Sequence, residues 1–555
     1  MATEDDESAL IIGAATEPSP ALAAAEAAPA AATAPAAATQ SAARSAGMVT
    51  AGIILSRLVG LVRQRFVAHY FGTSAFADVL AAGFRVGNIT QNLLGEGTLS
   101  ASFIPVYAKL RAQGKTREAT HFALSSLGLL LVTSTAASLL GVLFAPWLTR
   151  IIAAGFDPDR LENTVQVVRV LFPMTGLLVL SAWGLGVLNA HRRFFLPYAA
   201  PVVWSLAQIV GLGIFGTWLE HRGEPLAMAV AWSALVGAGL QLLLLLPAAR
   251  ALLGGDLTPR FDHRDENVRE AGRRLPAALL GRGVIQISGL IDMALVSFLG
   301  PGANATFTYA QTVYLLPMSL LGTGEAAAAL PAMAGESAEQ DLEVRNAALR
   351  RRLGASIARI TVITVPTTLA FLLLGQDLIR VLLQSGSFDR AATARVEPLL
   401  AAYGFALLGN ASGRVLITTA YAIGDTKTPT RYAVYRVVAS TIVSVILMRW
   451  LDVLGVVLGA VFAAWVETIA LGFKLRSQLG GLGLDQVKPA KTLLLGALSV
   501  GPAALLRAAL PEGFAASLPA SLLVLAVFGG SFAVAAPLLG LFDVRSLLGR
   551  FRRRP

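Results

Sequence analysis

The sequence contains no cysteine and unusually few charged residues. Cysteine is absent from all 555 positions, which excludes disulfides, thiolate metal sites and cysteine nucleophiles. Charged residues make up 14% of the chain, against roughly 25% in a soluble globular protein. The five histidines show no HExxH or other ligand spacing, and no GxxxxGK[ST] phosphate loop is present. We therefore expect no metal site, and no transport driven by ATP hydrolysis on this chain.

Hydrophobic residues are abundant and occur in long runs. They form 55% of the chain, and the mean hydropathy is +0.65. The runs 122–148 and 226–249 are too long for tilted barrel strands and suit helices, which need roughly 20 apolar residues to cross a bilayer. Only helices and closed barrels satisfy their backbone in lipid. The sequence thus predicts an all-α polytopic membrane protein with about fourteen transmembrane helices and no cofactor.

Fourteen apolar segments follow one another, separated by short polar loops. We expect spans at 48–70, 76–108, 122–148, 164–190, 196–219, 225–249, 275–299, 304–333, 353–374, 393–423, 430–451, 454–474, 491–510 and 515–541. Residues 1–47 are rich in Ala and Pro and carry no basic region typical of a signal peptide, so we expect a disordered tail. Residues 543–555 form a basic tail.

Arginine and lysine gather in alternate loops. The loops after spans two, four, six, eight, ten and twelve are basic, whereas the intervening loops are poor in these residues. By the positive-inside rule both termini are cytoplasmic, which agrees with an even number of spans. The net charge of +11 therefore indicates contact with anionic membrane lipid and not with nucleic acid.

A short internal repeat suggests two related halves. Leu93–Gly97 in span two and Leu321–Glu325 in span eight are both Leu- and Gly-rich, contain a glutamate, and are followed by a proline. We expect two pseudo-symmetric six-helix lobes, at 48–250 and 275–475, and two additional helices at 488–542. Repeated halves around a central site are a common transporter plan.

The first two spans carry an unusual set of charges. Each charge at the bilayer centre costs on the order of 3 kcal/mol and needs a reason. Arginine suits phosphate because its planar fork donates two parallel hydrogen bonds. A water-filled cationic site for an anionic substrate would explain Arg57, Arg63 and Arg85. Glu96 could instead be a structural partner of an arginine, and Asp78 could cap a helix start.

The second half has its own intramembrane charges. Asp292 and Glu325 lie deep in spans seven and eight, and either could be a proton or cation site or the counter-ion of Arg414. Arg282 lies near the predicted cytoplasmic end of span seven, so an interfacial position is its simplest explanation.

Three stretches resemble the MurJ (MviN) family of lipid II flippases. They are Ser56–Arg63, with the residues that follow it as far as Tyr107; Gln376–Asp389; and Tyr421–Pro429. The resemblance runs from about residue 48 to 545. It implies a central cationic cavity, alternating access, and a lipid-tail groove formed by the two C-terminal helices. The implied cargo is undecaprenyl-pyrophosphoryl-MurNAc-pentapeptide-GlcNAc, and the implied location is the inner membrane, where cell-wall synthesis machinery is a further expected partner.

By position, the resemblance assigns Arg57, Arg63, Asp78 and Glu96 to the substrate site. The chain departs from the family where Gln311 and Thr312 replace an Asp-Arg pair, so Arg282 is a candidate replacement ligand. Arg414 follows Asn410 by one turn. A carboxylate at this position would suit a bound cation better than an arginine does. An Arg414–Asp292 ion pair could therefore take the place of a bound cation. Two alternatives stay open, namely export of another lipid-linked saccharide and a scaffold derived from a flippase.

Overall fold

The chain folds into helices in the computed structural model, which describes residues 36–193, 195–318, 333, 336–337 and 341–541. Within these residues all secondary-structure elements are helices, apart from an isolated β-bridge between Ser385 and Phe388. The chain divides into two compact units, residues 1–305 and 306–555. The boundary falls inside helix α10 (Ala303–Met318).

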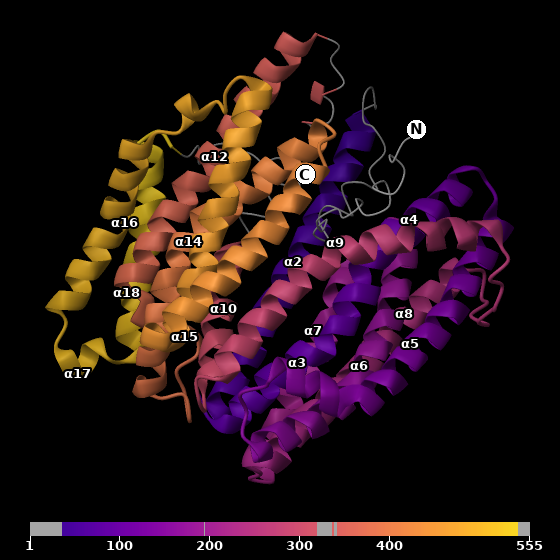
Figure 1. Cartoon of the computed structure of the whole chain (residues 1–555), viewed down its shortest axis with the longest axis horizontal. Coiled ribbons are helices and arrows are strands. Elements are labelled where there is room, and N and C mark those ends of the chain that lie inside the picture. Colours follow the sequence, from indigo (N-terminus) through magenta and orange to yellow (C-terminus); the bar gives the residue numbers. More distant parts are fainter. Residues whose placement is uncertain (1–35, 194, 319–332, 334–335, 338–340, 542–555) are drawn as a thin grey trace, which may run out of the picture. The chain divides into compact units, whose positions relative to one another are not determined.

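The first unit contains the helices coloured from indigo to magenta in Figure 1. These are α2 (Ala36–Phe71), α3 (Ala75–Leu94), α4 (Glu96–Ala112), α5 (Thr116–Ile152), α6 (Pro158–Ala190), α7 (Phe195–Gly211), η1 (Leu212–Trp218), α8 (Gly223–Leu252) and α9 (Glu266–Ser297). Helix α9 packs on α3, α4 and α5, although the predicted lobes would place it in the second half. The division at 250 and 275 stays a prediction.

The second unit contains the orange and yellow helices of Figure 1. After α10 these are α12 (Leu342–Leu373), α13 (Gly375–Leu382), α14 (Arg390–Ala422), α15 (Lys427–Leu479), η3 (Leu484–Gln486), α16 (Pro489–Ala509), α17 (Glu512–Ala515) and α18 (Leu518–Leu538). The two C-terminal helices α16 and α18 pack on each other, and α16 also packs on α12.

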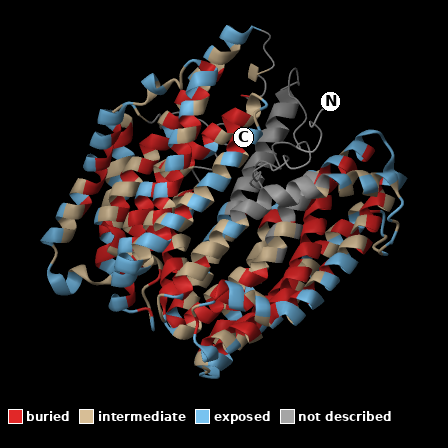
Figure 2. Cartoon of the chain, in the orientation of Figure 1, coloured by how far each residue is buried: buried red, intermediate tan, exposed pale blue. Residues whose placement is uncertain are grey.

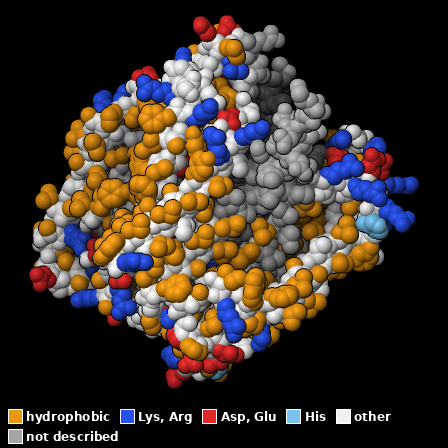
Figure 3. Space-filling model, viewed as in Figure 1, with side chains coloured by type: hydrophobic (Ala, Val, Ile, Leu, Met, Phe, Trp, Pro, Cys, Tyr) orange, Lys and Arg blue, Asp and Glu red, His pale blue; other side chains and the backbone are white. Residues whose placement is uncertain are grey.

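The helices are apolar on their outer faces as well as inside. Nine helices within the described residues are long and apolar enough to cross a membrane. Their exposed side chains include Leu143, Phe144 and Trp147 on α5 and Trp450 on α15, and Figure 3 shows hydrophobic side chains over much of the visible face. Apolar surface on this scale does not face water in a stable monomer, so the fold is that of a multi-pass membrane protein.

Helix α6 forms the centre of the first unit, with α3, α5 and α8 packed around it. Trp183 is completely buried and donates its indole N–H to the carbonyl of Ala123, 3.0 Å away. Phe103, Phe122 and Tyr107 stack beside it in one apolar cluster of buried residues. Figure 2 shows these inward faces as buried. A tightly packed core of this kind gives the neighbouring charged side chains a fixed frame.

The predicted second span is not one continuous helix. It consists of α3 and α4, which are separated at Gly95, whose backbone is not helical (φ −84°, ψ −139°). A Cβ atom at Gly95 would lie 2.3 Å from the carbonyl oxygen of Gln91. The break therefore needs glycine at this position.

Helix α15 covers 53 residues, which is about 80 Å of helix and far more than one bilayer crossing requires. Asp452 interrupts it with φ 47° and ψ −132°. The two halves then run back along each other, because Ser444 donates to the carbonyl of Val456 at 3.2 Å and Arg436 pairs with Glu467 at 3.0 Å. The turn lies where the sequence predicts the boundary between spans 430–451 and 454–474.

Candidate functional site

The three arginines predicted to bind an anion lie on the first two spans of the first unit. Arg57 and Arg63 are on α2, and Arg85 is on α3. The side chain of Arg57 is exposed, whereas Arg63 and Arg85 are half-buried.

Arg63 lies where α2 packs along α7. Its Nη1 donates to Oε1 of Gln208 at 3.1 Å, and its guanidinium lies 4.8 Å from the ring centroid of Trp204. Its Nε is buried without a hydrogen-bond partner. Within the described part of the chain, no carboxylate forms an ion pair with Arg63. The positive charge is thus held in place without being neutralised.

Arg85 extends from α3 to the backbone of α9. A Cβ atom added at Gly289 would lie 1.4 Å from Nη2 of Arg85, so the guanidinium occupies the space that any larger residue would need. Asp292, one turn further along α9, is half-buried. Glycine at position 289 therefore allows Arg85 to lie directly on this helix.

Asp78 is completely buried at the start of α3. Its carboxylate accepts hydrogen bonds from the backbone N–H groups of Gly302 at 2.6 Å and Ala305 at 2.8 Å. Arg160 also donates to it, at 3.3 Å. The sequence left open whether Asp78 caps a helix. It does cap one, but the helix is α10 and not its own, which begins with Ser74 as the N-cap.

The candidate coupling residues of the second unit are placed differently. Asn410 donates to the hydroxyl of Tyr314 at 2.8 Å, and Tyr314 stacks on Tyr403 with ring centroids 4.8 Å apart. Arg414 is exposed on α14. Asp292 belongs to the first unit and Arg414 to the second, so the ion pair expected between them stays a prediction.

Three predicted site residues lie outside the described part of the structure. Glu325 falls in the undescribed stretch 319–332, and the side chains of Glu96 and Arg282 are not described although their helices are. At the altered positions of span eight, Thr312 donates its hydroxyl to the carbonyl of Thr308 at 2.8 Å.

The sequence did not single out two side chains that contact Arg63. Gln208 and Trp204 lie four residues apart on α7, and Gln208 is completely buried. The sequence could have indicated Gln208, because a glutamine inside an apolar helix carries an amide that needs hydrogen-bond partners when it is buried. Its partner could not be identified before the packing of α2 on α7 was known.

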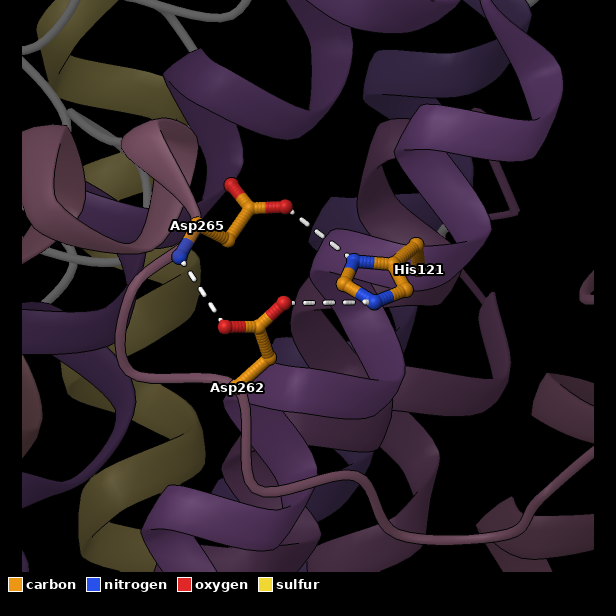
Figure 4. A group of neighbouring side chains, drawn as sticks. All are labelled: His121, Asp262 and Asp265. Carbon is orange, nitrogen blue, oxygen red and sulfur yellow. Dashed lines mark hydrogen bonds and ion pairs between the residues drawn. The ribbon is translucent and has the colours of Figure 1, made fainter.

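A second polar cluster joins the loop between α8 and α9 to the start of α5. Figure 4 shows Asp265 at one ring nitrogen of His121 and Asp262 at the other, with distances of 3.1 and 3.6 Å. The ligand atoms of these three residues lie within 4.8 Å of one another. A metal ion would need one ring nitrogen and an oxygen of each carboxylate to point at a single position. Each carboxylate instead lies at a different ring nitrogen, and the contact with Asp265 joins α5 to the N-cap residue of α9.

The ends of α4 and α6 are joined by a third polar contact. Nε2 of His191 lies 3.0 Å from the hydroxyl of Tyr107, and Arg111 donates to the carbonyl of Ala190 at 3.0 Å. Burial, together with the nearby charges of Arg111 and Arg193, lowers the pKa of His191 to about 4. The imidazole is therefore neutral near pH 7.

The fold and the apolar helices together define a class, the polytopic helical membrane proteins. The structure matches a multidrug resistance MATE family transporter of the MOP superfamily in an inward-facing conformation, with a TM-score of 0.57 and 18% identity over 83% of this chain and 98% of that one. It also matches a chain described as lipid II flippase MurJ in an inward closed conformation. There the TM-score is 0.70 at 18% identity, over 90% of this chain and 99% of the other. At these identities the matches establish the fold.

Sequence comparison establishes the family. The profile of the family described as lipid II flippase MurJ matches residues 67–523. A probable lipid II flippase MurJ of Rhizobium tropici is 31% identical over 422 residues, which are 75% of this chain and 77% of that protein. The lipid II flippase MurJ of Burkholderia cenocepacia is 28% identical over 450 residues, 80% and 84% of the two chains. This chain belongs to the MurJ family, whose members are membrane transporters of peptidoglycan biosynthesis and not enzymes.

Proposed function

We propose that this chain moves lipid II from the cytoplasmic to the outer leaflet of the inner membrane by alternating access. The pyrophosphate of the cargo binds a cationic surface formed by Arg57, Arg63 and Arg85. One observation carries the assignment. Arg63 is half-buried in a membrane helix, and no carboxylate within the described residues neutralises it. A fixed, uncompensated guanidinium favours an anionic ligand.

The remaining predicted residues take supporting roles in this proposal. Asp78 orders the site by capping α10, and Glu96 pairs with an arginine. Arg282 supplies the second-lobe charge that is missing at Gln311 and Thr312. Asp292, Glu325, Asn410 and Arg414 form the coupling region, with an Arg414–Asp292 ion pair in place of a bound cation.

The organisation is proposed from the charge pattern and the repeat. Two six-helix lobes, 48–250 and 275–475, carry out the alternating access, and the helices within 488–542 hold the polyprenyl tail. Both termini are cytoplasmic, and the cell-wall synthesis machinery is a further partner.

Complementation tests the function. A bacterium depleted of its own lipid II flippase receives the wild-type chain or the variants Arg57→Ala, Arg63→Ala, Arg85→Ala and Arg282→Ala, with membrane expression confirmed for each. Growth should be restored by the wild type and lost with Arg63→Ala, because a lost charge-assisted contact costs on the order of tenfold or more in affinity. Arg117→Ala, at an exposed position on α5, is the matched control and should restore growth.

A second candidate function is export of another lipid-linked saccharide, which the neutral Gln311 and Thr312 favour. A well-expressed wild type that does not rescue growth but binds a different undecaprenyl-pyrophosphoryl sugar would support this function over lipid II transport. A chain that binds no lipid-linked saccharide would instead be a scaffold.

A further inference from the structure

Helix α2 is held against α7 and the following helix η1 on both sides of Arg63. On one side Gly52 faces Tyr198 of α7, where a Cβ atom on the glycine would lie 2.7 Å from the tyrosine Cβ. On the other side the hydroxyl of Tyr70 contacts that of Thr217 in η1. Because both ends are fixed, the side chains between them have little freedom to move apart. Arg63, Trp204 and Gln208 lie in this interval.

Gln208 has one orientation that satisfies its amide. Its Nε2 donates to the carbonyl of Trp204, one turn earlier, at 3.2 Å. Its Oε1 is thereby directed to Arg63 and accepts from Nη1 at 3.1 Å. The side chain is completely buried, so water does not compete for either bond. A neutral acceptor here fixes the guanidinium without removing its charge.

Trp204 provides the second support. The guanidinium of Arg63 lies over its ring at 4.8 Å, and Phe84 of α3 meets the indole edge-on at 6.3 Å. A cation over an indole face is attracted to the ring, and the attraction is stronger in a desolvated site than in water. This offsets part of the cost of burying the charge, again without a carboxylate.

The cluster keeps two buried donors without partners among the described residues. They are Nε of Arg63 and Nε1 of Trp204. Buried polar groups in native proteins are nearly always hydrogen-bonded, so two orphaned N–H groups beside one uncompensated cation point to an acceptor that binds there.

We propose that Gln208 and Trp204 are positioning residues for anion binding, which hold Arg63 charged and oriented toward the phosphate oxygens of the cargo. Trp204 also offers its Nε1–H as a donor to the same group. This inference rests on the proposed function for the identity of the cargo, but Gln208 and Trp204 lie outside the set of residues taken from the family resemblance.

Gln208→Glu tests the positioning role. The introduced carboxyl would pair with Arg63 when ionised, and protonation would remove that pairing. Binding of fluorescent lipid II to the purified full chain in nanodiscs is measured from pH 8 to pH 5 and expressed as the ratio of variant to wild-type Kd. Titration of the cargo itself then cancels. We expect about tenfold weaker binding at pH 8, equivalent to one lost ionic contact, and recovery toward the wild type at pH 5.

Matched variants separate this effect from damage to the fold. Gln241→Glu introduces the same charge at another buried glutamine, on α8, and should leave the Kd ratio unchanged. Trp204→Tyr should bind more tightly than Trp204→Leu, because tyrosine keeps an aromatic face under the cation. If Gln208→Glu does not fold, the comparison of the two Trp204 variants still tests whether Trp204 positions Arg63.

The outcomes distinguish the inference from the proposed function. A Kd ratio that stays at one, or that is raised equally at every pH while Trp204→Leu binds normally, overturns the positioning role. If the wild type does not bind lipid II, the proposed function fails, and the same variants are titrated with undecaprenyl pyrophosphate, which carries the same anionic group. A wild type that binds neither ligand overturns both proposals.

Discussion

At the residue scale, a charged residue within a predicted span can have either of two different structural roles. Arg63 and Asp78 are both charges within predicted spans, and both were assigned to the substrate site. The structure gives Asp78 three donors, from Gly302, Ala305 and Arg160, whereas the partners of Arg63 among the described residues are neutral. A carboxylate whose oxygens are already engaged has little capacity for a ligand. We therefore expect Asp78 to act on stability and Arg63 on binding.

Asp78→Asn tests this difference. The amide cannot accept from both backbone N–H groups and also pair with Arg160, which would keep a buried charge without its partner. Breaking such a buried pair costs about 3 kcal/mol, so thermal unfolding in detergent should occur at a clearly lower temperature.

Asp157→Asn is the matched control, because Asp157 pairs with the same Arg160 but is 49% exposed, and exposed pairs contribute little. Normal stability of Asp78→Asn with loss of lipid II binding would return Asp78 to the substrate site.

At the scale of elements, polar contacts at helix ends fix which helices lie together. His191 joins the ends of α4 and α6, and His121 joins the start of α5 to the N-cap of α9. The sequence showed these histidines only as scattered residues near predicted helix ends. Their partners are 84 and 144 residues away along the chain, so no local pattern could identify them.

The contact at His191 predicts a dependence of stability on acid. The folded-state pKa is lowered to about 4, whereas an unfolded histidine titrates near 6.5. Below about pH 6.5 the unfolded chain binds more protons at this site than the folded chain. The contribution of neutral His191 to the free energy of unfolding is therefore present above about pH 6.5 and is lost as the pH falls toward about 4.

His191→Gln should reduce this loss, because glutamine can accept from Tyr107 and does not take up a proton. The measurement is the difference in unfolding temperature between pH 7 and pH 5 for the variant and the wild type. Equal differences in the two proteins would show that His191 does not contribute to acid sensitivity.

At the scale of the whole molecule, the absence of cysteine provides a direct test of topology. Single cysteines at Arg264→Cys and Pro301→Cys, both exposed loop positions, are labelled in intact cells with a membrane-impermeant maleimide. The charge pattern predicts that position 301 reacts from outside and that position 264 reacts only after lysis. The reverse pattern would invert the proposed orientation, and the cysteine-free wild type provides the background.

The sequence alone determined that this is a helical, multi-pass membrane protein, because hydropathy and backbone satisfaction in lipid depend on composition and segment length. It also located most helices, and its motifs indicated the family. Only the tertiary structure decided how individual polar groups are used. Span two breaks at Gly95, Asp78 caps α10, and Arg63 is held by Gln208 and Trp204. The last two outcomes depend on contacts between residues far apart in the chain, which no local periodicity encodes.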